Sequence, residues 1–130
     1  MVQTTSVLRN PVFLRGGNYN GTPSMTKTPV LREQLMQHFA NDSQHWRNAV
    51  FVPLGDKAAD ALNYLSGQGI VSMSQVLAGL PHPSGENAER IAYFLGTKAK
   101  LALSPKTDPG RLDLARIQLR TQTQGLLLAA

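Results

Sequence analysis

The sequence contains no cysteine, which excludes disulfide bonds and thiolate metal sites. No apolar run approaches the roughly 18–20 residues that a membrane-spanning helix needs, and residues 1–10 lack the apolar core of a secretory signal peptide. We therefore expect a cytoplasmic protein with no membrane partner. Acidic residues are few, with eight Asp and Glu against thirteen Lys and Arg, and the net charge is +5. This basic balance favours polyanionic partners, nucleic acid first.

The chain has the length and composition of a folded globular protein. Its 130 residues are 42% hydrophobic and 16% charged, which allows a single hydrophobic core. The sequence contains neither a Walker-type phosphate loop nor the G-x-S-x-G turn of a serine hydrolase. His38 and His45 lie seven residues apart without an evident carboxylate partner, so we expect neither a metal nor another cofactor.

Helical periodicity recurs along the chain, with apolar residues three and four positions apart. Leu31, Leu35 and Phe39 fall on one face of the first such stretch. Asp108 and Pro109 are expected as the cap and the first residue of the last helix. The expected helices are at about 28–41, 56–67, 88–95 and 110–122, followed by a frayed tail.

Three stretches are typical of strands. Residues 2–9 are rich in Val and Thr, while residues 48–55 and 76–80 are apolar runs of the kind found in buried parallel strands. A strand, a helix and a strand with short connections indicate a right-handed βαβ unit. The predicted fold class is therefore α/β, a three-layer α/β/α arrangement with a short, mostly parallel central sheet. We expect the core to span 1–103, and 104–130 to form a linker, a basic helix and the tail.

The stretch 75–90, QVLAGLPHPSGENAER, is the strongest candidate for a functional loop. Its apolar run stops at Pro81-His82-Pro83-Ser84-Gly85, and a helical pattern follows. In α/β folds, ligands bind where a strand delivers such a loop to a helix. The alternative is that this loop is only a turn, with Ser84 as a helix cap.

A second loop, at 16–24, is dense in Gly and Asn and contains no acidic residue. Arg9, Arg15 and Lys27 flank it. Its residues Asn18, Tyr19 and Asn20 are candidates to touch a phosphate backbone or a base. The alternative is a mobile surface loop.

The residues GLPHPSGENAER at 79–90 resemble the second signature of the uracil-DNA glycosylase superfamily, in which His-Pro-Ser opens a helix after a strand. VFVPLGDKAADAL at 50–62 is similar to the strand–Gly–helix unit that comes before that signature in bacterial members. TTSVLRNPVFLRGGNYNG at 4–21 is similar to part of a poorly characterised bacterial branch. The resemblance covers about residues 4–97, and HPSGxN with VPLG about 27 residues upstream is more specific than the tripeptide HPS.

The resemblance implies a hydrolase of DNA N-glycosidic bonds that acts in base excision repair on a flipped base. It implies that the His82 side chain donates to the carbonyl oxygen of the departing base, where a fixed donor lowers the barrier. Pro81 and Pro83 would fix the backbone on either side of that histidine. The residues implied or proposed to contact DNA are Pro83, Ser84, Gly85, Asn87, Arg90, Asn18, Tyr19 and Asn20.

The chain departs from the family's pattern at its first signature, a Gly-rich loop whose acidic or amide residue positions the attacking water. These 130 residues carry no equivalent, and Thr-Thr-Ser stands at 4–6 where the uracil-reading Asn would fall. We therefore expect either the C-terminal portion of a longer protein of this fold, without its N-terminal part, or a naturally short homologue. Three hypotheses stay open. The chain is an active glycosylase, a non-cleaving module that binds nucleic acid through residues 83–85, Arg15, Lys27 and Arg90, or a fragment that forms oligomers through an exposed sheet edge.

Overall fold

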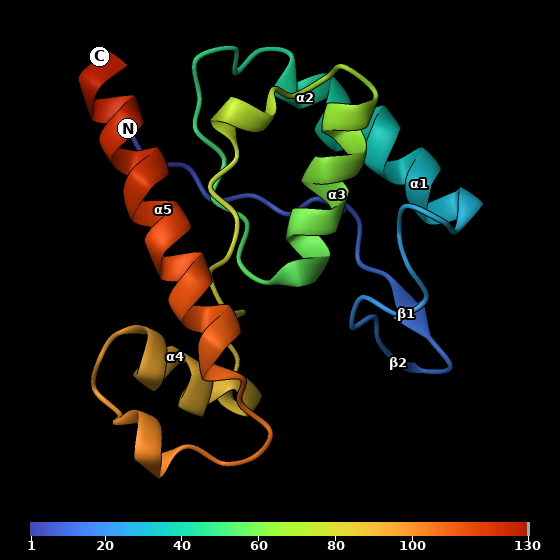
Figure 1. Cartoon of the computed structure of the whole chain (residues 1–130). Helices are drawn as coiled ribbons and strands as arrows, with labels where there is room; N and C mark the ends of the chain where they lie inside the picture. Colours follow the sequence, from blue (N-terminus) through green and yellow to red (C-terminus); the bar gives the residue numbers. More distant parts are fainter. Residues whose placement is uncertain (130) are drawn as a thin grey trace. The chain divides into compact units, whose positions relative to one another are not determined.

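The structure is a computed structural model and describes residues 1–129 (Figure 1). The chain forms two compact units, of which unit 1 comprises Met1–Ala49 and Asp60–Gln75, and unit 2 comprises Val50–Ala59 and Val76–Ala130. Helix α3, Asp56–Gly67, contributes to both units. The expected division after residue 103 stays a prediction, and Ala130, the end of the expected tail, lies outside the described residues.

Unit 1 contains the first expected helix, which runs from Pro29 to Ser43 in three consecutive segments. These segments are α1, Pro29–Gln34, a π-helical stretch, Leu35–Ala40, and α2, Asn41–Ser43. Proline suits the first helical position because its missing N–H would have no helical partner there. The Thr28 hydroxyl donates to the Ser24 carbonyl instead of capping the helix.

Helical spacing in unit 1 correctly predicted which side chains are buried. Leu31, Leu35 and Phe39 are all buried, as are the apolar residues on the inner side of α3. These positions exclude water from one face of each helix, which is the main stabilising contribution for short helices. The buried apolar residues of unit 1 are Met25, Leu31, Leu35, Phe39, Ala40, Ala61, Leu62, Leu65 and Val71.

A small hairpin in unit 1 pairs β1, Phe13–Leu14, with the antiparallel β2, Gly17–Asn18. Its two turn residues, Arg15 and Gly16, have φ angles of 51° and 79°. Positive φ at both central residues is what a type I′ turn requires, and this turn matches the twist of paired strands. The first three residues of the stretch 16–24, which we expected to be a loop, therefore belong to a hairpin.

Unit 2 contains two extended segments that lie parallel to each other. They meet at two isolated bridges, Phe51 with Val76 and Leu54 with Leu80. The Leu77 amide donates to the Phe51 carbonyl at 2.9 Å, and the Gly55 amide donates to the Leu80 carbonyl at 3.1 Å. The segments are thus neighbours without forming a continuous ladder.

The predicted three-layer α/β/α fold is wrong, and so is its short, mostly parallel central sheet. The described residues are mostly helical, and their only strand ladder is the antiparallel β1–β2 pair. Residues 2–9 form no strand, and residues 48–55 and 76–80 contribute only isolated bridges. A sheet gains its stability from three or more paired strands with a covered face, and the two parallel segments have no third strand among the described residues.

The helices of unit 2 are α4, Ala88–Phe94, preceded by a 3₁₀ turn at Gly85–Asn87, and α5, Pro109–Ala129. Asp108 caps α5 as expected, because its Oδ1 accepts from the Arg111 amide at 3.2 Å. Helix α5 continues through the expected frayed tail to Ala129. No helix among residues 1–129 combines the length and apolar composition needed to cross a membrane.

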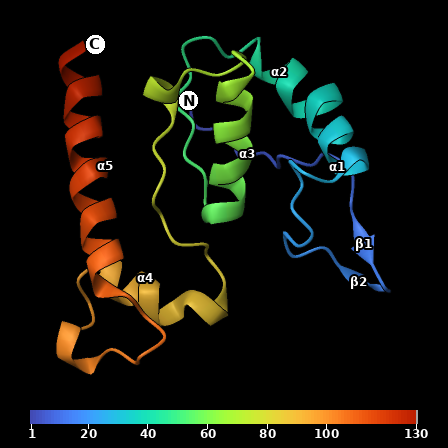
Figure 2. The same ribbon diagram turned by 45° about the vertical axis from the view of Figure 1, so that its right-hand side comes forward.

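Glycine allows α5 to lie directly against one extended segment of unit 2. A Cβ atom built on Gly79 would lie 3.0 Å from the Ala115 Cβ and 3.6 Å from the Leu119 Cδ1, and the φ angle of this glycine is 118°. Both the space and the backbone conformation therefore require glycine here. Figure 2 shows α5 running alongside this part of the chain, with α4 near its first turns.

Candidate nucleic-acid interface

The PHPSG loop makes a tight turn directly after the parallel bridge at Leu80. The Ser84 amide donates to the His82 carbonyl at 2.9 Å, which closes the turn around Pro83. His82 and Pro83 are exposed, and Pro81 and Ser84 are half-buried. The His82 imidazole makes no hydrogen bond within residues 1–129, so both of its nitrogens are available to a ligand.

Gly55 forms the surface against which His82 packs. A Cβ atom on Gly55 would lie 2.8 Å from the His82 Cβ, 3.3 Å from its Cα and 3.4 Å from its Cδ2. Gly55 is also buried and has a φ angle of 93°, a conformation that side chains disfavour. The hydrogen bond from the Gly55 amide to the Leu80 carbonyl, two residues before His82, also holds Gly55 next to this loop. The position of His82 thus depends on a glycine 27 residues earlier.

A chain of three polar side chains follows the loop. Asn87 Nδ2 donates to Ser84 Oγ at 2.7 Å, and Asn87 Oδ1 accepts from Arg90 Nη1 at 2.7 Å. The amide group of Asn87 is therefore used within the protein, while the hydroxyl proton of Ser84 remains free to donate to a ligand. Arg90 Nη2 also donates to the Lys106 carbonyl at 3.3 Å, which holds the guanidinium next to the loop 96–108.

Glu89 fastens the loop 96–108 to α4. Its Oε1 accepts from Lys98 Nζ at 2.8 Å and from the Ser104 amide at 3.1 Å, while its Oε2 accepts from Ser104 Oγ at 2.7 Å and from the buried Thr107 hydroxyl. The hydrogen bond from Lys98 and those from Ser104 and Thr107 hold the pKa of Glu89 far below its usual range. Glu89 is therefore a structural clamp, a side chain whose hydrogen bonds hold the loop 96–108 to α4.

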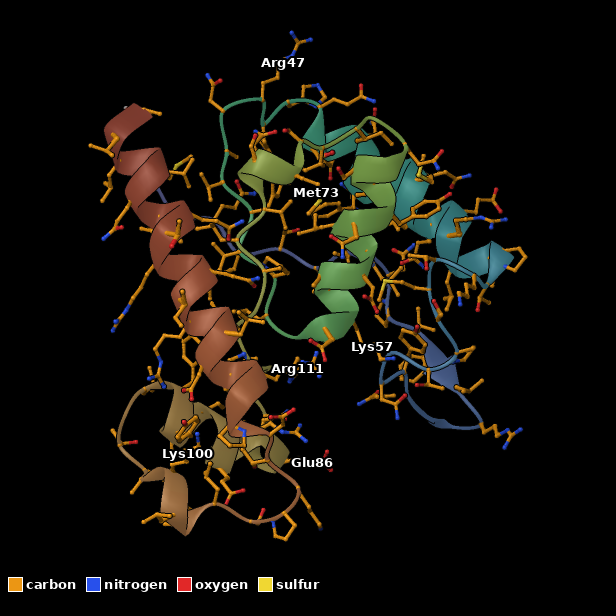
Figure 3. All side chains as sticks on the ribbon, in the orientation of Figure 1. Arg47, Lys57, Met73, Glu86, Lys100 and Arg111 are labelled. Carbon is orange, nitrogen blue, oxygen red and sulfur yellow. The ribbon has the colours of Figure 1, made fainter. Side chains whose placement is uncertain are left out.

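Two arginines of α5 are held by contacts within unit 2. Arg111 Nη2, in the first turn of α5 (Figure 3), contacts Asp56 Oδ2 at 2.8 Å. Arg116 donates from Nη2 to the Tyr93 carbonyl at 2.7 Å and lies 5.6 Å from the ring centres of Tyr93 and Phe94. Its Nε is buried without a hydrogen-bond partner among the described residues. Arg116 is thus mainly part of the packing between α4 and α5.

Tyr93 is the buried polar anchor between α4 and α5. Its hydroxyl donates to both carboxylate oxygens of Asp113, at 2.9 and 3.0 Å. Burial, followed by the hydrogen bond to Asp113 and its negative charge, raises the pKa of Tyr93 above its usual value. This pair fixes α5 relative to α4 and leaves neither group free for chemistry.

One exposed carboxylate lies in the turn that begins after Ser84. Glu86 occupies the 3₁₀ turn Gly85–Asn87 and carries no hydrogen bond among the described residues (Figure 3). A phosphate placed on the amides of this turn would therefore meet a negative side chain. Contacts to a nucleic-acid backbone would be better supplied by Arg90, next to this turn, than by the turn itself.

The three predicted residues of the first loop belong to unit 1 and form their own cluster. Asn18 lies in β2, the Tyr19 hydroxyl donates to the Pro23 carbonyl, and Asn20 Oδ1 accepts from the Thr22 amide at 3.2 Å. Burial raises the pKa of Tyr19. These hydrogen bonds stabilise the loop. The exposed ring beside them is Phe13, with 67% of its surface accessible.

The sequence reasoning missed three residues of the unit 2 cluster. From the sequence, Gly55 is expected only at the end of the strand 48–55, although a glycine directly after an apolar run is a usable signal for close packing. Glu89 and Lys106 carried no local signal, because their partners are 9 to 18 residues away. The structure brings Ser84, Asn87 and Arg90 into one hydrogen-bonded chain beside His82.

No metal site adds to this cluster in the described part of the chain. Among residues 1–129, no group of three or more His, Asp or Glu side chains is placed to hold a metal ion. His38 and His45 are in unit 1, at the end of the first helix and just after it.

Comparison with known proteins finds a relative of known sequence but without an assigned function. The chain is similar to the uncharacterized protein YoxB of Bacillus subtilis (strain 168), with 33% identity over 117 residues. The match covers 88% of this chain and 46% of YoxB, so the chain spans about half the length of this curated relative. No family model matches the chain. No solved structure matches it either.

Proposed function

We propose that this chain is a uracil-DNA-glycosylase-like protein whose PHPSG loop binds a flipped base in DNA. The observation that supports this most is the packing of His82 on Gly55, with both imidazole nitrogens free of hydrogen bonds to residues 1–129. A side chain fixed in this way needs little reorganisation to donate a hydrogen bond. The resemblance of residues 79–90 to the second glycosylase signature supplies the substrate class.

The proposed chemistry is the hydrolysis of an N-glycosidic bond. As the bond to the base breaks, negative charge develops on the base, and His82 would donate to its carbonyl oxygen. Ser84, whose hydroxyl proton is free, and Arg90 would hold the neighbouring phosphates. The loop needs no metal for these contacts. The residue that positions water would come from the first signature, which residues 1–130 do not carry.

A second candidate is binding of nucleic acid without cleavage. It is favoured by the lack of that water-positioning signature and by the hydrogen-bonded series Ser84, Asn87 and Arg90. Contacts from such side chains to DNA phosphates do not depend on the base sequence. The net charge of +5 supports the same partner. The cysteine-free composition leads us to place either activity in the cytoplasm.

A comparison of two histidine variants tests the catalytic proposal. The readout is abasic product from uracil-containing single-stranded DNA. We expect His82→Ala to lower the rate by on the order of 10²–10³, the usual loss for a donor to a developing oxyanion. His45→Ala is the matched control, because His45 is also exposed but belongs to unit 1.

Measuring cleavage and DNA binding on the same protein distinguishes the two candidate functions. Absence of abasic product from the wild-type chain, together with salt-dependent DNA binding that Arg90→Gln weakens, leaves only the binding module. Phosphate contacts predict affinity that falls steeply as salt rises. A wild-type chain that neither cleaves nor binds such DNA would contradict both.

A further inference from the structure

The segment Val50–Leu54 has one paired edge and one open edge. Phe51 and Gly55 direct their backbone groups to the parallel segment at 76–80, as their hydrogen bonds show. Successive residues of an extended chain point their N–H and C=O groups to opposite sides. The groups of Val50, Val52 and Leu54 therefore point away from that partner, and within residues 1–129 they form no hydrogen bond.

This open edge lacks the features by which proteins usually block pairing. Exposed edges are commonly protected by charged side chains, a proline or a bulge. Residues 49–55, AVFVPLG, contain no charge. Pro53 offers no protection, because its missing N–H would point to the side of Leu80, which is already paired. The residues on the open side, Val52 and Leu54, keep their backbone N–H groups as hydrogen-bond donors.

The side chains on this segment are apolar and accessible. Val50, Val52 and Leu54 alternate along the chain, and 42%, 48% and 47% of their surfaces are exposed. Alternation places all three on one face. Beside Val52 lies a groove of about 790 Å³, which Leu77 and Leu80 also line, together with residues of α5 that include Arg116 and Arg120.

We propose that Val50–Leu54 is a self-association edge that pairs antiparallel with the same segment of a second copy. A two-fold axis at Val52 places each Val52 opposite its counterpart, and each Val50 opposite a Leu54. Val50, Val52 and Leu54, whose backbone groups point away from the segment at 76–80, then lie opposite the same three residues of the other copy. Two parallel segments per copy become a four-stranded sheet, which is large enough to be stable.

The second copy fits this edge because the edge is complementary to itself. Every opposing pair is aliphatic, so pairing removes apolar surface from water. The excess positive charge of the chain lies outside residues 49–55, so two copies bring uncharged segments together. A closed two-fold pair also uses each open edge once, which prevents continued growth into a fibre.

The test is sedimentation of the full chain over a wide concentration range, combined with amide hydrogen exchange. We expect a monomer–dimer equilibrium, with slower exchange at Val52 and Leu54 in the dimer. Val52→Lys places like charges opposite each other at the two-fold axis and should raise the dissociation constant roughly ten-fold or more. Met73→Lys is the matched control, because Met73 is 49% exposed and lies outside this edge.

Circular dichroism of both variants establishes that they fold. A wild-type chain that stays monomeric at every concentration would overturn the proposal that a second copy pairs with this edge. A dimer that Val52→Lys leaves intact also overturns it, because another surface then holds the copies together. Loss of the dimer in Met73→Lys as well as in Val52→Lys would likewise contradict an edge-specific contact.

Discussion

Replacing Gly55 with alanine should lower the free energy of unfolding by about 2–4 kcal/mol, the sum expected for a strained backbone and a steric overlap. The added Cβ would lie 2.8 Å from the His82 Cβ, and the φ angle of 93° already disfavours a side chain. Because His82 is part of a short proline-bounded turn, it must move if the chain is to fold. Urea unfolding followed by circular dichroism measures the effect.

Gly96→Ala provides the matched control for this substitution. Gly96 also lies in unit 2 and has a φ angle of 79°, but a Cβ there would meet nothing within 4 Å. It should therefore cost only the backbone strain, about 1–2 kcal/mol. Equal losses for Gly55→Ala and Gly96→Ala would show that Gly55 does not support His82.

Replacing Glu89 with glutamine should remove a pH-dependent part of the stability of unit 2. Its pKa is lowered in the folded chain by Lys98, Ser104 and Thr107, so folding favours the ionised form. The stabilisation is complete above the unfolded pKa of about 4.3 and is lost as the pH falls toward the lower folded pKa. The wild-type chain should therefore lose stability below about pH 5 more steeply than Glu89→Gln.

The measurement is the urea midpoint of both proteins at neutral and at acidic pH. The difference between wild type and Glu89→Gln should be large at neutral pH and smaller in acid. Glu86→Gln is the matched control, because Glu86 is exposed in the preceding turn and has no hydrogen bond among residues 1–129. If Glu86→Gln and Glu89→Gln gave the same midpoints at both pH values, the clamp would not exist.

Local sequence rules predicted the helices well because each rule concerns neighbouring residues. Leu31, Leu35 and Phe39 marked a buried face, and Asp108 with Pro109 marked the start of α5. Helix α3 begins at Asp56 and ends at Gly67, as its apolar spacing and closing glycine indicated. In each case the signal and the structure lie within a few residues of each other.

The sheet was predicted wrongly because pairing is not a local property. The run at 48–55 has the composition of a buried strand, but a strand is stable only with partners on its edges. Among the described residues its one neighbour is the segment at 76–80, and the two meet at isolated bridges. The apolar pattern indicated a preference for extended structure, but it did not indicate how many strands would pair.

The candidate site was predictable only in part for the same reason. His82, Ser84 and Arg90 are close in sequence, so their proximity needed no knowledge of the fold. Gly55 and Lys106 come from distant positions, and only the folded chain shows that they contact this loop. The order of side chains in the cluster, and the use of both polar atoms of Asn87 inside the protein, were likewise not visible in the sequence.

The most direct test of the proposed DNA contact is an NMR titration of the histidine side chains. The chain has three histidines, His38, His45 and His82, so two of them serve as internal controls. Adding a uracil-containing single-stranded oligonucleotide should shift the imidazole signals of His82 and leave those of His38 and His45 in place. DNA binding that leaves His82 unchanged, or that shifts His38 or His45 instead, would contradict the proposal that the PHPSG loop is the interface.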